Sequence, residues 1–241
     1  TGAADLVFYI NGGNPDAGSD VLNFTTVSGP TILDLGNATI DDIGLGVGVD
    51  VFYSGVEIIN LDANVQSLTV NATLGDDTVE VTPLTSTSGV LRANGVDPVL
   101  SYSNLNPAGT FLVDVLTGGE DRLVVYGNST GETITVTPTV VTASGQAITY
   151  ANAEALTVDG REGSDTFLVT PSTTTAIFID GGDPIGGTGA NRDVLNITVG
   201  AAAVTRNPGA ESDEGSFVVG ANLPVSFDHI EGGTITGAGV G

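Results

Sequence analysis

Aspartates that follow a glycine recur at a fixed spacing and could bind a cation. The pattern Gly-x-Asp ends at Asp77, Asp121 and Asp165, and these aspartates are 44 residues apart in both intervals. Carboxylate oxygens are the hard ligands that Ca²⁺ prefers, about six to eight at a time. The same side chain can instead cap a turn by accepting hydrogen bonds from backbone N–H groups. The motif therefore predicts either a calcium ligand or a capped turn at each position.

Other acidic residues extend this set of candidates. Glycine-rich loops contain further aspartates near residue 15 and near residue 185, and Asp76 stands beside Asp77. The candidate calcium ligands are Asp16, Asp20, Asp76, Asp77, Asp121, Asp165, Asp183 and Asp193. Three glutamates, Glu57, Glu154 and Glu231, each follow an aromatic residue by four positions, and we interpret them as residues that stabilise turns.

Catalysis has little support in the residue types. His229 is the only histidine, and the chain has no cysteine and no lysine. No nucleophile elbow, phosphate-binding loop or zinc-protease motif is present. Paired carboxylates could serve glycoside hydrolysis, and Arg161 stands beside Glu162 and near Asp165. We therefore predict that the protein is not an enzyme, with a β-helical polysaccharide-degrading enzyme as an alternative.

The charge limits the partners. The formal net charge is −24, and the five basic residues are all arginines. Such a chain repels nucleic acid and anionic membrane surfaces. No run of about 18 apolar residues is present, so no membrane insertion is expected. The first residue is Thr1 and not methionine, which indicates a mature product or a piece of a longer chain.

Two further signatures repeat along the chain. The first is an aromatic residue, two variable residues, an apolar residue and usually glutamate; it begins at Tyr53, Tyr102, Tyr150 and Phe227. The second joins an Asn/Asp-Gly-Gly-Asn/Asp-Pro turn to the strand-like sequence Asp-Val-Leu-Asn, and it occurs at residues 10–24 and again at residues 179–197. Repeats of this kind are typical of solenoids, which stack supersecondary units.

Short β-rich runs separated by turn residues lie between these signatures. No window shows a sustained helical period, because Gly, Thr or Val interrupts each one. The predicted strands are Leu6–Ile10, Thr31–Leu35, Val65–Val70, Thr78–Thr82, Phe111–Leu116, Leu123–Tyr126, Thr133–Thr137, Ala155–Asp159, Thr166–Thr170, Ala176–Ile179, Val194–Val199 and Ser216–Val219. Two polar stretches, Asn94–Pro98 and Asn207–Ser216, are predicted to be surface loops.

The repeat length favours an all-β solenoid. A unit of 44 to 49 residues fits two coils of roughly 22–24 residues, and about ten coils would form a parallel β-helix. We expect one domain over residues 1–241, with repeat units near 10–83, 84–137, 138–178 and 179–241. The recurring aromatic residues should then stack at equivalent places in one core. Tandem antiparallel β-sandwich modules are the alternative, although no linker is visible.

A resemblance adds to this interpretation. The stretch from Gly160 to Leu168, GREGSDTFL, is similar to the nonapeptide of RTX-type calcium-binding repeats, with Arg161 in place of the second glycine. The longer segment 131–167 resembles the degenerate repeats of very large secreted bacterial surface proteins. This resemblance implies an extracellular β-solenoid with a structural or adhesive role, and calcium held between consecutive turns. The 44-residue spacing departs from an uninterrupted ladder of such turns.

The functional expectation follows from these observations. We expect a non-catalytic structural protein of the bacterial cell surface or extracellular matrix that self-assembles into a fibre or layer, with Ca²⁺ as its cofactor. A calcium-binding adhesin stalk is the alternative role. The partner is expected to be a second copy, joined head to tail through the apolar first strand, Asp5–Ile10.

Overall fold

The computed structural model describes residues 7–13, 19–46 and 48–237, which form β-strands and no helix. The all-β class is therefore confirmed. Within these ranges there is no helix that is long and apolar enough to cross a membrane. Most predicted strands are present with ends shifted by a few residues, as for β1 (Phe8–Asn11) in place of Leu6–Ile10, of which Leu6 lies outside the described residues.

By contacts, the chain divides into two compact units. The N-terminal unit comprises residues 1–121 with 148–152, and the C-terminal unit comprises residues 122–147 with 153–241. The predicted repeat boundaries within one domain stay a prediction.

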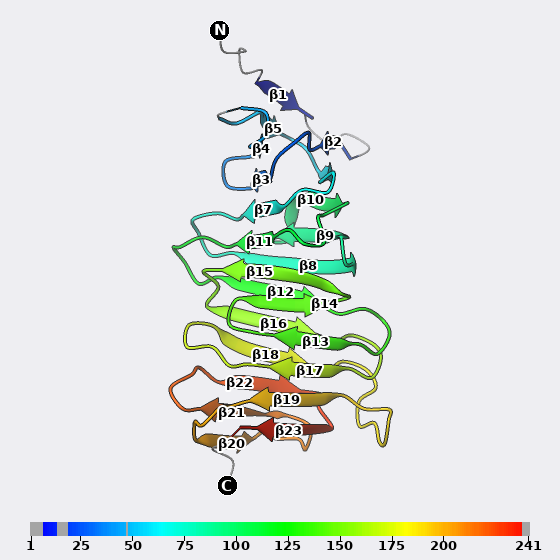
Figure 1. The fold of residues 1–241 in the computed structure, drawn as a ribbon, viewed down its shortest axis with the longest axis vertical. Coiled ribbons are helices and arrows are strands. Elements are labelled where there is room, and N and C mark those ends of the chain that lie inside the picture. Colours follow the sequence, from blue (N-terminus) through cyan, green and yellow to red (C-terminus); the bar gives the residue numbers. More distant parts are fainter. Residues whose placement is uncertain (1–6, 14–18, 47, 238–241) are drawn as a thin grey trace. The chain divides into compact units, whose positions relative to one another are not determined.

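Two sheets make up the N-terminal unit, and the chain crosses repeatedly between them (Figure 1). The strand order is β1-β5-β4-β3-β7-β11-β15 in sheet A and β2-β6-β10-β9-β8 in sheet B. The strands are β1 (Phe8–Asn11), β2 (Val21–Thr25), β3 (Thr31–Asp34), β4 (Thr39–Asp42), β5 (Val51–Ser54), β6 (Ile58–Asp62), β7 (Leu68–Asn71), β8 (Thr78–Thr85), β9 (Ser88–Ala93), β10 (Val96–Ser103), β11 (Phe111–Asp114) and β15 (Gln146–Ala151).

The C-terminal unit is built in the same way. Its order is β14-β13-β17-β19-β23 in sheet A and β12-β16-β18-β22-β21-β20 in sheet B. The strands are β12 (Arg122–Tyr126), β13 (Thr133–Val136), β14 (Val140–Ala143), β16 (Ala155–Asp159), β17 (Thr166–Val169), β18 (Ala176–Asp180), β19 (Val194–Thr198), β20 (Val204–Pro208), β21 (Gly215–Val219), β22 (Val225–Asp228) and β23 (Gly232–Thr236).

Parallel registers align the buried side chains of neighbouring strands. Leu33 pairs with Val70, which also pairs with Val113, and each of the three is at most 1% exposed. The residues between them on each strand face outward, as the period of two requires. Burial of each such side chain contributes about 1.5–3 kcal/mol. The parallel pairing of most strands argues against the antiparallel sandwich alternative.

The recurring aromatic residues are buried, as predicted, but they do not stack in one column. Tyr53, Tyr102, Tyr150 and Phe227 are between 1% and 7% exposed. Within the N-terminal unit, however, Tyr53 and Tyr150 lie in sheet A and Tyr102 lies in sheet B. The expectation of equivalent stacking was wrong because the signature marks the end of a strand before a corner, and that corner can belong to either sheet.

One predicted loop was also wrong. Residues 94–98 form a tight turn followed by the start of β10, which pairs antiparallel with β9. The turn has positive φ at Asn94 (55°) and Gly95 (65°), as a type I′ hairpin turn requires. The other predicted loop, residues 207–216, overlaps the ends of β20 and β21 and connects them.

Candidate functional site

The aspartates of the Gly-x-Asp turns lie immediately before a strand and are buried. Asp77 precedes β8, Asp121 precedes β12 and Asp165 precedes β17, and their exposed fractions are 1%, 1% and 0%. Asp193, before β19, is also 0% exposed. Tight backbone approach at these corners demands glycine: a Cβ on Gly163, whose φ is +126°, would lie 2.3 Å from the backbone nitrogen of Gly131.

Hydrogen bonds join successive turns of the C-terminal unit through their carboxylates. Asp165 Oδ1 accepts the backbone N–H of Glu132 at 2.7 Å, and Asp193 Oδ1 accepts that of Asp165 at 2.6 Å. Glu231 Oε2 accepts the backbone N–H of Asp193 at 2.8 Å. We call Glu132, Asp165, Asp193 and Glu231 the carboxylate column. It connects each turn to the next one along the stack of strands.

The N-terminal unit has the same contacts. Asp121 Oδ1 accepts the backbone N–H of Asp77 at 2.8 Å, and Asp76 Oδ1 accepts that of Glu120 at 3.1 Å. Glu57 Oε2 accepts the backbone N–H of Asp20 at 2.6 Å. Glu57 and Glu231 are therefore turn-stabilising residues, as we interpreted them.

Asp77 is satisfied on both carboxylate oxygens. Its Oδ1 accepts Asn94 Nδ2 at 2.6 Å, while its Oδ2 accepts the backbone N–H of Thr73 at 2.9 Å and the Thr73 hydroxyl at 2.8 Å. These contacts are those of a capped turn, and they leave Asp77 little capacity for a metal ion.

Asp165 and Asp193 of the C-terminal unit differ from Asp77, because each has only one carboxylate oxygen that accepts a hydrogen bond. The Oδ2 atoms of Asp165 and Asp193 are buried and have no hydrogen-bond partner. Burial raises the pKa of Asp165 to about 7, with repulsion from Asp193, Glu132 and Asp159 acting in the same direction. Burial likewise raises the pKa of Asp193 to about 6, and Glu231 and Asp180 add to the effect. Asp165 therefore takes up a proton near neutral pH, whereas Asp193 does so at slightly acidic pH.

Most candidate calcium ligands are not brought together. In residues 7–13, 19–46 and 48–237, no three acidic, histidine or cysteine side chains converge as metal ligands do. Asp183 is exposed, whereas Asp193 is fully buried, and Asp16 lies outside the described residues. Calcium ligation at these positions stays a prediction, and the contacts of Asp77 favour its alternative, the capped turn.

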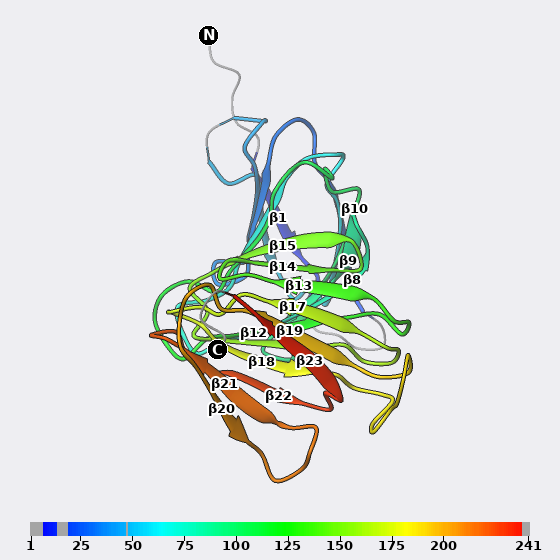
Figure 2. The same ribbon diagram turned by 60° about the horizontal axis from the view of Figure 1, so that its bottom comes forward.

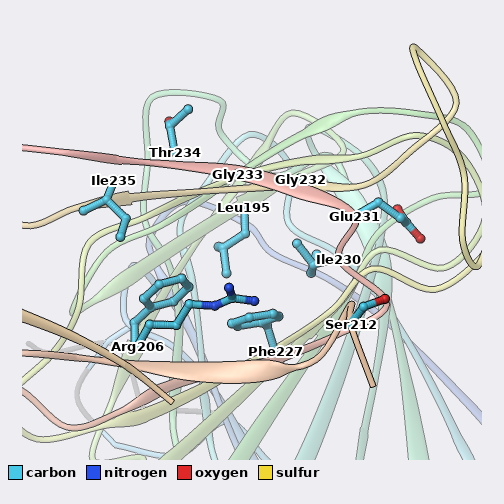
Figure 3. Close-up of a pocket in the computed structure, with 11 residues that line it drawn as sticks. Leu195, Arg206, Ser212, Phe227, Ile230, Glu231, Gly232, Gly233, Thr234 and Ile235 are labelled. Atoms are coloured by element: carbon cyan, nitrogen blue, oxygen red, sulfur yellow. The ribbon is translucent and has the colours of Figure 1, made fainter. Parts of the chain in front are cut away.

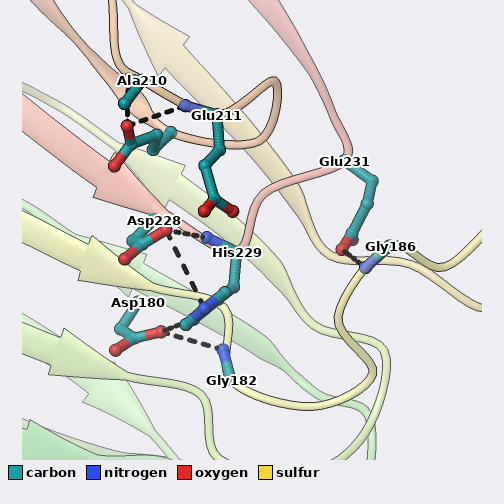
Figure 4. Close-up of polar contacts among 9 residues, drawn as sticks. Asp180, Gly182, Gly186, Ala210, Glu211, Asp228, His229 and Glu231 are labelled. Carbon is teal, nitrogen blue, oxygen red and sulfur yellow. Dashed lines mark hydrogen bonds and ion pairs between the residues drawn. The ribbon is translucent and has the colours of Figure 1, made fainter.

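An exposed hollow of about 420 Å³ is lined in part by His229, the only histidine of the chain. His229 Nδ1 lies 2.8 Å from Asp180 Oδ1, and its Nε2 lies 3.9 Å from Asp228 Oδ1 (Figure 4). The hydrogen bond to Asp180 raises the pKa of His229. The residues lining the hollow are Asp159, Arg161, Glu162, Asp180, Gly182, Asp183, Ile185 and His229. They include no hydroxyl or thiol nucleophile, and the guanidinium of Arg161 stacks 4.5 Å from the ring centroid of Tyr126.

The sequence analysis missed carboxylates that hold the turns, among them the half-buried Glu132 and the buried Asp42. Glu132 directly follows Gly131, so it lacks the spacer residue of Gly-x-Asp, and its carboxylate accepts the backbone N–H groups of Asn128 and Ser144. Asp42 is 0% exposed and accepts the backbone N–H groups of Val27, Gly29 and Gly44. A search for any acidic residue just before a β-rich run would have found Glu132. Nothing in the sequence around Asp42 indicated its role.

Comparison of the chain with protein-family models, with characterised proteins and with solved structures finds no match. The geometry of the turns and of the strand edges is therefore the basis for assigning a function.

Proposed function

We propose that this protein is a non-catalytic structural β-solenoid that builds or spaces an extracellular fibre or layer. In each unit the chain alternates between two mostly parallel sheets, so one strand from each sheet with its corners makes one coil. A single coil cannot bury its own apolar face, and stacking supplies the missing contacts. The fold would then be a stack of coils whose core is shared between neighbours.

The observation that carries this proposal is the use of the repeated carboxylates. Asp121, Asp165 and Asp193 are at most 1% exposed, and each accepts the backbone N–H of the preceding turn. A group in this position cannot touch a substrate, but it can hold one coil on the next. The most regular feature of the sequence, its repeated carboxylates, thus stabilises the contacts between turns. No observation favours the polysaccharide-degrading alternative.

Uncovered strand edges support self-assembly. Among the described residues β1 pairs only with β5, and its three large side chains are exposed: Phe8 by 50%, Tyr9 by 78% and Ile10 by 36%. Proteins normally protect such edges, because an unpaired strand invites pairing with another chain. An adhesin stalk would need the same stacking, and calcium would help either role by reducing repulsion among the carboxylates.

Negative-stain electron microscopy of the purified protein tests the proposal. We expect filaments or sheets at high protein concentration and in salt that screens the net charge of −24. Particles that remain single under all these conditions would overturn the assembly role.

A further inference from the structure

In the C-terminal unit, β23 is the last strand of sheet A and β20 is the last strand of sheet B (Figure 2). A hollow of about 280 Å³ is lined by residues of β23 and has Leu195, Phe217 and Phe227 among its apolar walls (Figure 3). Gly232 and Gly233 of β23 also line it and contribute no side chain. Figure 3 shows the Arg206 side chain extending toward the Phe227 ring. Apolar surface of this kind is usually covered by the next layer of a core.

The edge of β23 is unprotected. Among the described residues it pairs only with β19, in parallel, with Leu195 opposite Gly233 and Asn196 opposite Thr234. Its sequence, GGTIT, has no charge and no proline, which are the usual devices against edge pairing. In a chain with a net charge of −24, an uncharged edge is well suited to meet another strand.

Strand β2 is the complementary edge in the N-terminal unit. Within the part of the chain that the structure describes it pairs only with β6, and its inward side chains, Leu22 and Phe24, are half-buried. Its sequence, VLNFT, is nearly that of β19, VLNIT. The matching β19 residues, Leu195 and Ile197, are only 3% and 1% exposed. The reason is that β19 has a second neighbour, β17, whereas the equivalent edge of β2 has no strand beside it in the described residues.

The surroundings of β2 and β19 are also equivalent. Asp20, just before β2, donates its backbone N–H to Glu57, as Asp193 before β19 donates to Glu231. The following strand is in the same register in both units, with Leu22 opposite Ile59 as Leu195 is opposite Gly233. A strand of the β2 type therefore already pairs in parallel with the other edge of β23 within this chain, and we use its register there to set the register at the free edge.

We propose that β2 of one copy pairs in parallel with the free edge of β23 of a second copy, Leu22 opposite Gly233 and Asn23 opposite Thr234. This inference rests on the proposed self-assembly and specifies its contact. Leu22 then enters the hollow opposite Gly233, which has no side chain, and Phe24 lies opposite Ile235. On the outer face, Asn23 already accepts Asn60 Nδ2 at 2.9 Å and Thr234 donates to Asn196 at 2.5 Å, so docking joins two polar pairs into one ladder.

Disulfide trapping tests the register, and the absence of native cysteine makes it clean. In the variant Asn23→Cys with Thr234→Cys, paired Cα atoms would lie about 4.8 Å apart, inside the range for a disulfide. The matched control, Asn23→Cys with Thr236→Cys, moves one cysteine by two residues on the same face, to about 8 Å. Oxidation should give a ladder of covalent multimers for the first pair, and at most dimers for the control and for Asn23→Cys alone. Equal ladders from both pairs, or none from either, would overturn the inference.

A charge inserted at the contact gives an independent measurement. Leu22→Asp should abolish multimers in sedimentation at high concentration, while Val21→Asp, which adds the same charge to the exposed face of β2, should leave most of them. The circular dichroism spectrum of each variant checks that the fold is retained. Filaments in the microscope without register-specific trapping would refute this contact and leave the proposed function standing, whereas single particles would refute both.

Discussion

Replacing Asp165 by asparagine should stabilise the protein above neutral pH. The carboxylate is 0% exposed and its Oδ2 has no hydrogen-bond partner, so ionisation places an uncompensated charge in the core. The folded state holds the pKa of Asp165 at about 7, against an ordinary value of 3.8. Because the folded pKa is raised, the folded state binds the proton more tightly than the unfolded chain does. The contribution of Asp165 to stability is therefore complete below about pH 4 and is lost as pH rises to about 7.

The size of the effect follows from the two pKa values. Each unit of difference is worth about 1.4 kcal/mol, so ionised Asp165 costs up to about 4 kcal/mol relative to the protonated acid. The asparagine side chain keeps the shape of the acid and an oxygen for the N–H of Glu132, and it cannot ionise. We expect Asp165→Asn to raise the free energy of unfolding by about 2–4 kcal/mol at pH 8 and by much less at pH 4.

Urea unfolding followed by far-ultraviolet circular dichroism at several pH values between about 4 and 8 measures the difference. Asp77→Asn is the matched control, since it removes the same charge from an aspartate whose two oxygens accept three donors. It should destabilise by about 1–3 kcal/mol at every pH, because one of those oxygens becomes a donor. If Asp165→Asn destabilised the protein equally at both ends of this pH range, the buried carboxyl would not be protonated as described.

Three further predictions concern the core and the turns. Tyr102→Ala should lower the free energy of unfolding, measured in urea, by about 3–5 kcal/mol. The residue is 1% exposed, its ring centroid lies 4.7 Å from that of Phe111, and it covers Gly89 on the paired strand. A loss below about 1 kcal/mol would contradict its place in the core. Tyr53→Phe should leave stability unchanged or raise it in the same assay, because the buried hydroxyl has no hydrogen-bond partner, and a clear loss would reveal one. Calcium and sodium at equal ionic strength should raise the thermal midpoint equally, compared with EDTA, if the turn aspartates are caps; a rise specific to calcium that Asp77→Ala removes would establish ligation.

The sequence pattern predicted the positions of the strands, but it did not predict whether neighbouring strands run parallel or antiparallel. Alternating apolar residues between glycine-rich turns indicated strands such as β16 and β17 at nearly their observed ends. The hairpins were missed because a strand has the same pattern of two whether its neighbour runs parallel or antiparallel. Asn94-Gly95 is the dipeptide of a two-residue hairpin turn, and reading it so would have recovered β9 and β10.

The turn carboxylates were identifiable from sequence, but their states were not. Asp77 and Asp165 occupy the same motif, yet Asp77 meets Thr73 and Asn94 while the second oxygen of Asp165 meets no donor. The donor Asn94 lies 17 residues away, in the turn of a hairpin that the repeat pattern does not specify. The difference between a satisfied cap and a proton-holding acid thus depends on partners brought in by tertiary structure.

The hairpins have a consequence for the straightness of the N-terminal unit. Strands β3–β5 add two extra strands to sheet A, and β8–β10 add two to sheet B. Each extra strand lengthens its wall by about 4.8 Å. Because one hairpin is added to each sheet, both sheets grow by about the same length, and the unit does not bend toward either sheet. Excision of one hairpin would shorten one wall by about 10 Å, so the placement of hairpins offers a way to set the curvature of a fibre built from such units.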